Sequence, residues 1–358
     1  MTRTFPIRSE VRAAIESRGS SSGPALIYDL AIIDRNLREA AACARRHDVR
    51  VLFAMKSFTD ERVWRLAAAR LDGLDAGSDA EARAAVACGA RMISITDPLA
   101  VAHADGAWIS CEHAQDLPSA PNLAVRFAAS HLVPGDDAVG GVLEGSGRRT
   151  SRFGVRTIDE ARAIVRAGGG RVRGIHVHHG GVAPASPERL VACARAAIAA
   201  AHEAELPLAW LDLGGGLHLL PDLDRAFAAL REVVPREIEL VVEPGRLFAR
   251  DAGFAIGHVR AARSIGDREL RVVDLSRACH LRWQHAAPVA TPAATGAARV
   301  MLFTGPTCYE EDVVGEWKLD PADFPVGAPL VVAGINGYAL GWNHGFGGVP
   351  PADVVLVE

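Results

Sequence analysis

A small set of residues of the types used in catalysis and cofactor binding lies at the ends of apolar, strand-like runs. In a (β/α)8 barrel the carboxyl ends of all strands meet on one face, and the active site lies on that face. Reactive residues that repeatedly end such runs therefore indicate one shared site. The set comprises Lys56 after VRVLFAM, His176, His178 and His179 in VRGIHVHH, Gly214, Gly215 and Gly216 after LAWLDL, and Glu243 at the end of IELVVE.

Lysine is rare in this chain. Lysines and arginines together number 39, and only Lys56 and Lys318 are lysines. A genome that favours arginine codons explains this bias for most of the chain. An arginine cannot lose its proton in a protein, whereas a desolvated lysine can act as a nucleophile or form an imine. Lys56, at the end of an apolar run, is a candidate for that chemistry, while Lys318 lies in a polar turn and is expected to be solvated.

Each of the other features also has an ordinary structural explanation. A glycine triplet after a strand is often a tight turn, but it can equally place backbone N–H groups around a phosphate. Glu243 can be an ion-paired core carboxylate, although its position before Pro-Gly at a strand end favours a functional role. Alternate strand residues point to opposite faces, so His176 and His178 share a face and His179 does not. No HExxH or carboxylate spacing supports zinc, so we predict no metal site and expect one histidine to stack or to handle a proton.

Pyridoxal 5′-phosphate (PLP) is a cofactor that uses all of these groups together. Its aldehyde forms a Schiff base with a lysine, and its pyridine nitrogen pairs with a charged or polar side chain. A glycine turn suits its phosphate, and a flat side chain suits the face of its ring. The four groups in this sequence therefore predict a PLP site.

The elements that must position this site follow a regular order. Strand-like and helical runs alternate from residue 25 to about residue 250, which predicts a parallel sheet, either a barrel or an open doubly wound sheet. After residue 250, strand-like runs are separated by Gly, Pro and Asp without convincing helices, which predicts an all-β domain. A long, Gly-rich loop at 132–154 is of a length that is usually functional or disordered.

Composition narrows the class of protein. A chain of 358 residues has room for two domains at about 150 residues each. The net charge of −4 argues against nucleic-acid or anionic-membrane partners. We find no apolar run of the ~18 residues that a membrane span needs and no secretory signal. The six scattered cysteines contain no CxxC pair and indicate neither disulfides nor zinc, so a cytoplasmic protein is expected.

Ordered motifs connect these features to a known family. The chain resembles the alanine racemase-fold (fold type III) family of PLP-dependent amino-acid decarboxylases, which includes diaminopimelate, ornithine, arginine and carboxynorspermidine decarboxylases. The resemblance runs from ALIYDL to the C-terminus and implies a PLP-binding (β/α)8 barrel over 25–250, with a β-domain formed by 1–24 and 251–358. It also implies a head-to-tail homodimer with shared active sites. The motifs, in family order, are FAMKS, GLDAGSDAEA, RFGV, GIHVHHGG, LDLGGGL, EPGR, GPTCYEED and INGYA.

The resemblance also implies roles for individual residues. Lys56 resembles the Schiff-base lysine, His178 the histidine stacked on the ring, and Glu243 the residue on the pyridine nitrogen. Cys308 resembles the catalytic cysteine and Asp312 the substrate-binding acid, both supplied by the partner subunit. Many relatives have a serine where this chain has Gly181, so one polar contact to the cofactor is missing. The other implied cofactor contacts are Gly214, Gly215, Gly216, Gly245, Arg246 and Tyr338, and the other candidate substrate contacts are Glu310, Glu311 and Arg126.

The implied activity is decarboxylation of a polar, amine-bearing L-amino acid through a Schiff base and a quinonoid intermediate. The acidic residues of CYEED favour a cationic tail. The motif NGYALGWNHGFGG is closer to carboxynorspermidine decarboxylases than to diaminopimelate decarboxylases, and the expected substrate is carboxynorspermidine-like or diamino-acid-like. Alternatives are a decarboxylase of a siderophore or natural-product intermediate, an amino-acid racemase on the same fold, and a non-catalytic PLP carrier. A racemase would have Arg at the pyridine nitrogen in place of Glu243. A carrier would lack the roughly 100 residues after the barrel.

Overall fold

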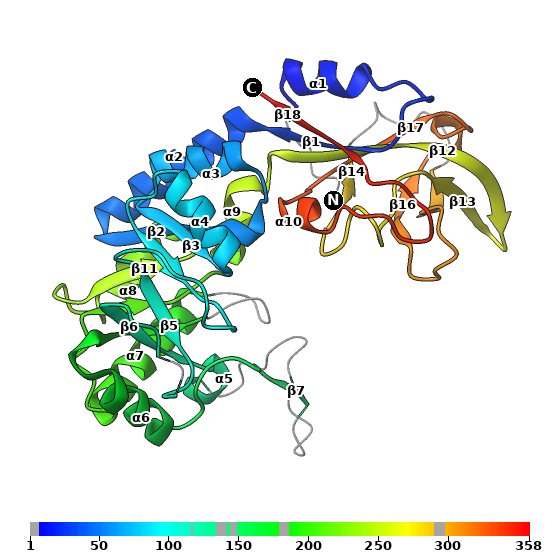
Figure 1. The fold of residues 1–358 in the computed structure, drawn as a ribbon. Coiled ribbons are helices and arrows are strands. Elements are labelled where there is room, and N and C mark those ends of the chain that lie inside the picture. The colour runs from blue at the N-terminus through cyan, green and yellow to red at the C-terminus, as the bar shows by residue number, and fades with distance from the viewer. Residues whose placement is uncertain (1–6, 116, 134–141, 144–148, 179–185, 290–297) are drawn as a thin grey trace. The chain divides into compact units, whose positions relative to one another are not determined.

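The computed structural model describes residues 7–115, 117–133, 142–143, 149–178, 186–289 and 298–358 (Figure 1). The chain folds into two compact units. The barrel unit comprises Asn36–Lys56 and Asp60–Leu247, and the β unit comprises Met1–Arg35, Ser57–Thr59 and Phe248–Glu358. Most of the predicted loop at 132–154 lies outside the described residues.

Eight parallel strands form a closed barrel in the barrel unit, in the order β10-β11-β2-β3-β4-β5-β6-β9. The closed barrel decides between the two predicted sheet types and confirms the expected fold class. The strands read as short apolar runs because helices cover their outer face and neighbouring strands fill the interior. They are β2 Val49–Ala54, β3 Gly73–Ala76, β4 Ile93–Ile95, β5 Trp108–Cys111, β6 Asn122–Phe127, β9 Val172–Val177, β10 Trp210–Asp212 and β11 Glu239–Val242.

Helices surround the barrel strands (Figure 1). Several begin at a side chain that accepts a hydrogen bond from the first turn, such as Ser78 before α4 and Thr157, which forms a capping box with Glu160 in α6. Each cap marks the end of the loop between a strand and the next helix, so it sets the length of the loop at the carboxyl end of that strand. The helices are α2 Leu30–Arg46, α3 Glu61–Arg70, α4 Asp79–Ala87, α5 Ala129–Leu132, α6 Ile158–Gly168, α7 Pro187–Glu203 and α8 Leu223–Arg231, with short 3-10 turns at Met55–Ser57, Gly169–Arg171 and Leu217–Leu219.

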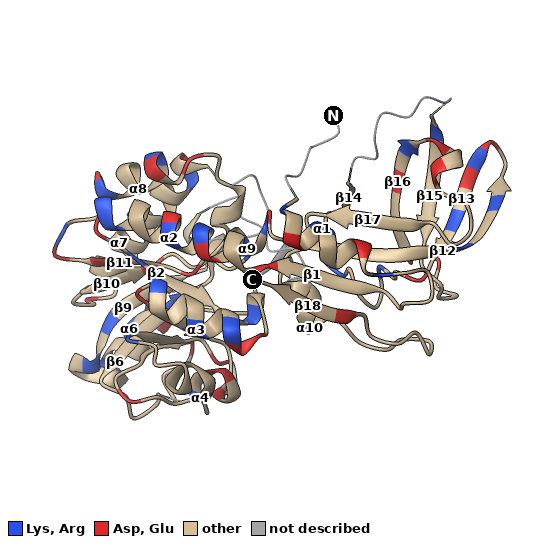
Figure 2. Ribbon diagram, turned by 90° about the horizontal axis from the view of Figure 1, so that it is seen from above, with Lys and Arg blue, Asp and Glu red and all other residues tan. Residues whose placement is uncertain are grey.

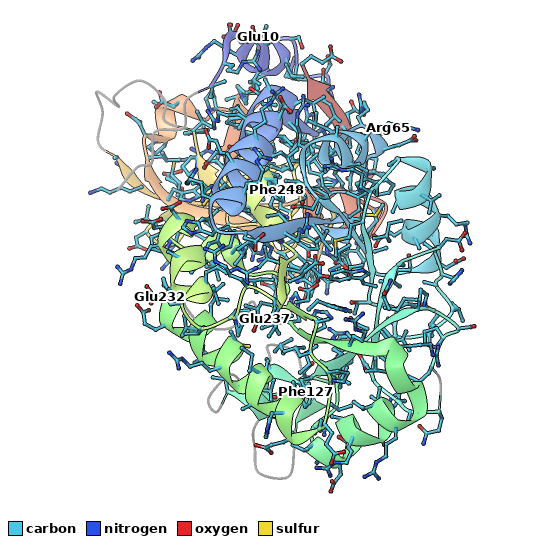
Figure 3. All side chains as sticks on the ribbon, turned by 90° about the vertical axis from the view of Figure 1, so that its left-hand side faces the viewer. Glu10, Arg65, Phe127, Glu232, Glu237 and Phe248 are labelled. Carbon is cyan, nitrogen blue, oxygen red and sulfur yellow. The ribbon has the colours of Figure 1, made fainter. Side chains whose placement is uncertain are left out.

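Side chains fill the barrel unit (Figure 3). Phe127 at the end of β6 is buried, whereas Glu232 and Glu237, after α8, lie at its outer surface. A Cβ at Gly174 would lie 2.1 Å from the ring of Trp210, so only glycine lets this indole pack between β9 and β10. The large Trp210 side chain therefore fits because Gly174 on the neighbouring strand has no side chain.

The β unit consists mainly of one sheet, in the order β14-β17-β12-β13-β15-β16, to which β1 and β18 add through β12. Helix α1 Ser9–Glu16 contributes Val11 to a core cluster that includes Ile27 and Phe254. This confirms the predicted β-rich second domain. The strands are β1 Ala25–Asp29, β12 Gly253–Ile265, β13 Arg268–Val273, β14 Ala287–Pro288, β15 Arg299–Thr304, β16 Val313–Leu319, β17 Pro329–Ala333 and β18 Asp353–Val357; the short helices α9 Arg246–Ala249 and α10 Tyr338–Gly341, the 3-10 turn Pro321–Asp323, and the separate strand pair β7 Val142–Leu143 and β8 Arg149–Thr150 complete the chain.

The predicted domain boundary at residue 25 is wrong. The run ALIYDL was expected to begin the barrel, but β1 pairs antiparallel with β12 and parallel with β18 in the β unit. The barrel unit instead begins at Asn36. All five residues of β1 are buried, and a short apolar run of this kind suits either sheet, so its pattern does not show which strands flank it.

Charged residues of both signs are interspersed over each unit, in keeping with the small net charge (Figure 2). Within the described ranges, no helix has the length and apolar character that crossing a membrane requires.

Candidate active site

Lys56 lies in the 3-10 turn directly after β2, and its amine forms an ion pair with Asp75 at the end of β3. The Nζ atom donates to Asp75 Oδ2 at 2.8 Å. The Lys56 side chain is 43% exposed, whereas that of Asp75 is 0% exposed. The second oxygen of Asp75, Oδ1, has no hydrogen-bond partner among the described residues. The amine is therefore accessible to a small molecule and oriented by a buried carboxylate.

Glu243 and Asp212 form a buried pair of carboxyl groups. Asp212 ends β10 and Glu243 follows β11, and the two side chains are close enough for each to shift the pKa of the other. Burial, followed by the proximity of Asp212 and Asp75, raises the pKa of Glu243 well above its ordinary value. Burial raises the pKa of Asp212 to about 6. Because two neighbouring buried carboxylates repel each other, the pair retains a proton, which we place on Glu243.

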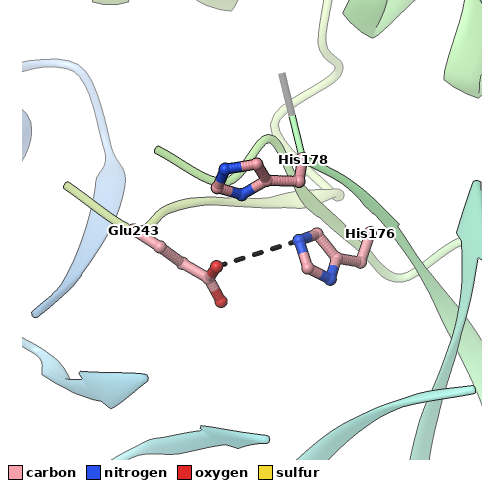
Figure 4. A group of neighbouring side chains, drawn as sticks. All are labelled: His176, His178 and Glu243. Atoms are coloured by element: carbon pink, nitrogen blue, oxygen red, sulfur yellow. Dashed lines mark ion pairs between the residues drawn. The ribbon is translucent and has the colours of Figure 1, made fainter. Parts of the chain in front are cut away.

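His176 and His178 approach Glu243 from β9 and the residue that follows it (Figure 4). Their ring centroids are 6.3 Å apart, and donor atoms of the three residues lie within 4.8 Å of one another. This geometry agrees with the prediction from strand alternation that His176 and His178 lie on the same face. His178 is the more accessible of the two rings. The predicted contacts of His179 and Gly181 lie outside the described residues.

His176 is buried and held by hydroxyl groups. Its Nδ1 lies 2.9 Å from Ser110 Oγ and 3.4 Å from Thr96 Oγ1. Burial, together with the nearby cation of Arg126, lowers the pKa of His176 well below its ordinary value, so the ring is neutral. Its Nε2 faces Glu243 Oε2 across 3.8 Å.

The glycine turn passes close to both His178 and Glu243. Gly214 has φ +64° and Gly216 φ +87°, which favour glycine at both positions. A Cβ at Gly214 would lie 2.6 Å from His178 Nδ1, and one at Gly215 would lie 3.2 Å from the Glu243 carbonyl oxygen. The Gly214 amide donates to Asp212 Oδ1 at 2.7 Å. The turn is thus anchored by a buried carboxylate beside the histidine.

The other candidate residues of the barrel unit are Gly245, Arg246 and Arg126. Gly245 and Arg246 directly follow Glu243 and are partly exposed. Arg126 on β6 is buried, donates to Glu112 Oε1 at 2.9 Å, and has its guanidinium 4.6 Å from the centre of the Phe153 ring. The ion pair holds Arg126 in place beside His176.

The β unit carries the remaining candidates. Cys308, Glu310 and Glu311 are exposed on the loop between β15 and β16, where the hydroxyl of Tyr309 donates to Glu311 Oε2 at 2.8 Å. Tyr338 begins α10 and is half-buried. Its ring forms a T-shaped contact with Trp283, with 5.7 Å between centroids.

Asp312 is not placed as a substrate-binding residue, which corrects the prediction from GPTCYEED. Its side chain is buried. Its Oδ1 accepts from Ser276 Oγ at 2.9 Å and from the Arg277 amide at 2.7 Å. Its Oδ2 accepts from Thr307 Oγ1 at 2.7 Å. A carboxylate whose oxygens are satisfied in this way anchors the loop of Cys308 to the segment after β13 and is not available to a substrate cation.

Comparisons with known proteins agree with this fold. No family model matches the chain. The chain is 27% identical to diaminopimelate decarboxylase of Deinococcus radiodurans, over 85% of this chain and 82% of that protein. The solved arginine decarboxylase of Paramecium bursaria Chlorella virus superposes with a TM-score of 0.78 at 18% identity, covering 98% and 100% of the two chains. Carboxynorspermidine decarboxylase of Campylobacter jejuni, complexed with norspermidine, gives a TM-score of 0.69 at 19% identity, covering 93% of each chain.

The chain is similar in sequence and in fold to the fold-type III decarboxylases. This similarity agrees with the resemblance seen in the ordered motifs and indicates a carboxy-lyase. The relatives named above differ in substrate, so the similarity does not assign a substrate to this chain.

The site described above suits PLP better than a metal ion. Glu243 Oε1 is buried and has no hydrogen-bond partner within the described part of the chain, as a group that pairs with an incoming ring nitrogen would be. The glycine turn leaves space that a Cβ would fill. His176, His178 and Glu243 are close enough to bind a metal together, but a carboxyl group that retains its proton is a poor ligand.

Sequence reasoning missed four polar residues of this site. Asp212 ends its strand, Asp75 and Ser110 are the last but one residues of theirs, and Thr96 directly follows its strand. The rule that strand ends carry the site applies to all four. Their motifs, GLDA, LDLGGG, WISC and ISIT, look like ordinary apolar strands with one small polar residue.

Proposed function

We propose that the chain is a PLP-dependent decarboxylase of an L-amino acid that carries a second, cationic amine. The observation that carries the proposal is the accessible Lys56 amine, paired with buried Asp75, in the same barrel unit as Glu243, His178 and the glycine turn. The similarity to these decarboxylases supports both the cofactor and the reaction class. The finer assignments below are proposals on that basis.

Each cofactor contact has a candidate residue. Lys56 holds the aldehyde carbon, His178 lies on the ring face, and Glu243 faces the ring nitrogen. Because the Gly214 amide already donates to Asp212, we assign the phosphate to the amides of Gly215 and Gly216. Arg246 helps to bind it, Gly245 leaves room for the backbone, and Tyr338 is a further proposed contact. When bound, PLP supplies an electron sink for the electron pair left behind by the departing carboxylate.

Lys56 and Asp75 act together in cofactor capture. Asp75 holds the Nζ atom at the barrel mouth, so the amine enters the site already oriented. The free oxygen of Asp75 gives the amine a second acceptor as it exchanges between cofactor and carboxylate. Arginine cannot replace Lys56, because a guanidinium does not form an imine.

Glu243 selects the reaction type. A carboxyl group on the ring nitrogen keeps a proton there, and the resulting positive charge strengthens the electron sink that decarboxylation needs. A racemase on this fold would have an arginine in this place, so the residue favours decarboxylation over the racemase alternative. The buried position of Glu243 excludes water that would otherwise exchange this proton.

The loop of Cys308 supplies the substrate end of the site. We propose that it acts in the partner subunit's site within a head-to-tail homodimer, with Cys308 returning a proton to the substrate α-carbon. Since Asp312 is saturated, the accessible carboxylates of the loop are Glu310 and Glu311, and both favour a cationic tail. Arg126 would meet a substrate carboxylate only if its ion pair with Glu112 opened, so its substrate role is secondary.

A panel of amino acids tests this function. Purified enzyme reconstituted with PLP should release CO2 from lysine, ornithine, arginine, diaminopimelate or carboxynorspermidine, and fastest from those with a free cationic tail. Glutamate and citryl-type siderophore precursors serve as the comparison set. Release of CO2 only from that acidic set would favour the natural-product alternative, and loss of substrate chirality without CO2 would favour a racemase.

A further inference from the structure

His176 occupies a position between a hydroxyl pair and the carboxyl group of Glu243. Ser110 Oγ lies 2.9 Å from Nδ1 on one side of the ring. On the other side, Nε2 is buried, has no hydrogen-bond partner in the part of the chain that is described, and faces Glu243 Oε2 across 3.8 Å (Figure 4). An unsatisfied ring nitrogen in a fully buried position is costly unless it meets a partner in the working state.

The hydroxyl groups favour one position for the proton of the His176 ring. A neutral imidazole has one N–H donor and one acceptor nitrogen. Two hydroxyls, of Ser110 and Thr96, converge on Nδ1, which suits an acceptor there. The proton then resides on Nε2 and is directed at the Glu243 carboxyl group.

We propose that His176 is a positioning residue that, oriented by Ser110 and Thr96, donates its Nε2–H to Glu243 and thereby keeps the proton of the Glu243–cofactor pair on the ring nitrogen. This inference rests on the proposed PLP function and adds a residue to it. A hydrogen bond to the charged form of a carboxyl group favours that form. Without the bond, burial and the neighbouring carboxyl groups favour neutral Glu243, and the proton leaves the ring.

Three variants separate this role from simple packing. His176→Phe keeps a ring of similar size but removes the donor. His176→Gln keeps an N–H donor on a shorter, flexible side chain. The double variant Ser110→Ala/Thr96→Val leaves His176 intact but removes the hydroxyl contacts that favour one of its tautomers. Ser130→Ala is the matched control, because Ser130 is a buried serine whose hydroxyl contacts His131 at 3.3 Å and not His176.

The measurement is the ¹⁵N chemical shift of PLP labelled at the ring nitrogen and bound to each protein. We expect a protonated shift in wild type and Ser130→Ala. In His176→Phe the ¹⁵N shift should move more than half of the way to the unprotonated value, and in the double variant it should move in the same direction. In His176→Gln the shift should be closer to that of wild type. An unchanged shift in both His176→Phe and the double variant overturns the inference.

A second readout does not need the cofactor. In PLP-free protein labelled with ¹⁵N-histidine, the imidazole shifts of His176 report its tautomer directly. The Nε2–H tautomer is expected, and it should be lost in the double variant; an Nδ1–H tautomer in wild type overturns the inference even where His176→Phe does not fold. Failure of wild type to bind PLP, or an unprotonated ring in wild type, would instead count against the proposed function.

Discussion

The Lys56 amine donates a 2.8 Å hydrogen bond to Asp75, a carboxylate with no exposed surface. Asp75 on β3 pairs with Ala54 at the end of β2, and Lys56 follows Ala54 by two residues, so the strand pairing brings the two side chains together. Burying a carboxylate is costly unless it is paired. Asp75 is therefore a residue placed for the amine, and Lys56 depends on it for orientation.

Replacing Asp75 with Asn should slow PLP capture and turnover. The amide keeps the shape but loses the charge-assisted hydrogen bond, which is worth about 1.5–3 kcal/mol. We expect a fall of about 10- to 100-fold in the rate of PLP incorporation, followed by absorbance. Asp159→Asn, at an exposed aspartate paired with Arg162, is the control and should behave as wild type. An Asp75→Asn protein that takes up PLP at the wild-type rate would show that the ion pair is incidental.

The carboxyl group of Glu243 should make the PLP-free protein less stable as pH rises. Its pKa is raised in the folded state, so the folded protein binds more protons than the unfolded chain above the ordinary pKa of the group, and stability falls with increasing pH. Asp212, with a pKa of about 6, acts in the same direction. Glu243→Gln removes the part of this dependence that Glu243 contributes and should gain stability relative to wild type between pH 5 and pH 8, measured as urea midpoints. A constant difference across that range would contradict the buried-proton assignment.

Much of the fold and part of the site could be predicted from the sequence, and the failures have physical causes. Lys56, His178 and Glu243 end apolar runs, and that placement identifies them. The sequence pattern places β1 in the wrong sheet because an apolar pentapeptide carries no information about its neighbours. Asp312 is assigned to the substrate by its position in a motif, and only its contacts with Ser276 and Thr307 show that its oxygens are already used.

Asp312→Ala should destabilise the β unit rather than weaken substrate binding alone. It leaves the donors of Ser276, Thr307 and two backbone amides unsatisfied in a buried place, at a cost of about 3 kcal/mol. Glu310→Ala on the exposed part of the same loop should change stability by less than about 0.5 kcal/mol and raise KM for cationic substrates. Denaturant unfolding and steady-state kinetics on both variants distinguish the roles. Wild-type stability with a raised KM in Asp312→Ala would restore the substrate-binding assignment.

The proposed shared site predicts complementation between two inactive variants. Lys56→Ala and Cys308→Ala should each be nearly inactive. In a mixed dimer, one site carries both changes and the other carries neither. Random re-pairing after co-refolding should therefore recover about a quarter of wild-type activity, since half of the dimers are mixed and each has one intact site. A mixture that stays inactive although its subunits exchange would place the whole site within one chain.

The central claim is that Lys56 and Glu243 carry out a PLP-dependent decarboxylation. The most direct test is mass spectrometry of the products formed in D2O from the best substrate, labelled with ¹³C at its carboxyl carbon, with Lys56→Arg as the control. Wild type should give ¹³CO2 and an amine with one deuterium on the former α-carbon, and Lys56→Arg should give neither product. Recovery of the amino acid with its ¹³C-carboxylate intact and deuterium at the α-carbon, or equal activity in Lys56→Arg, would contradict it.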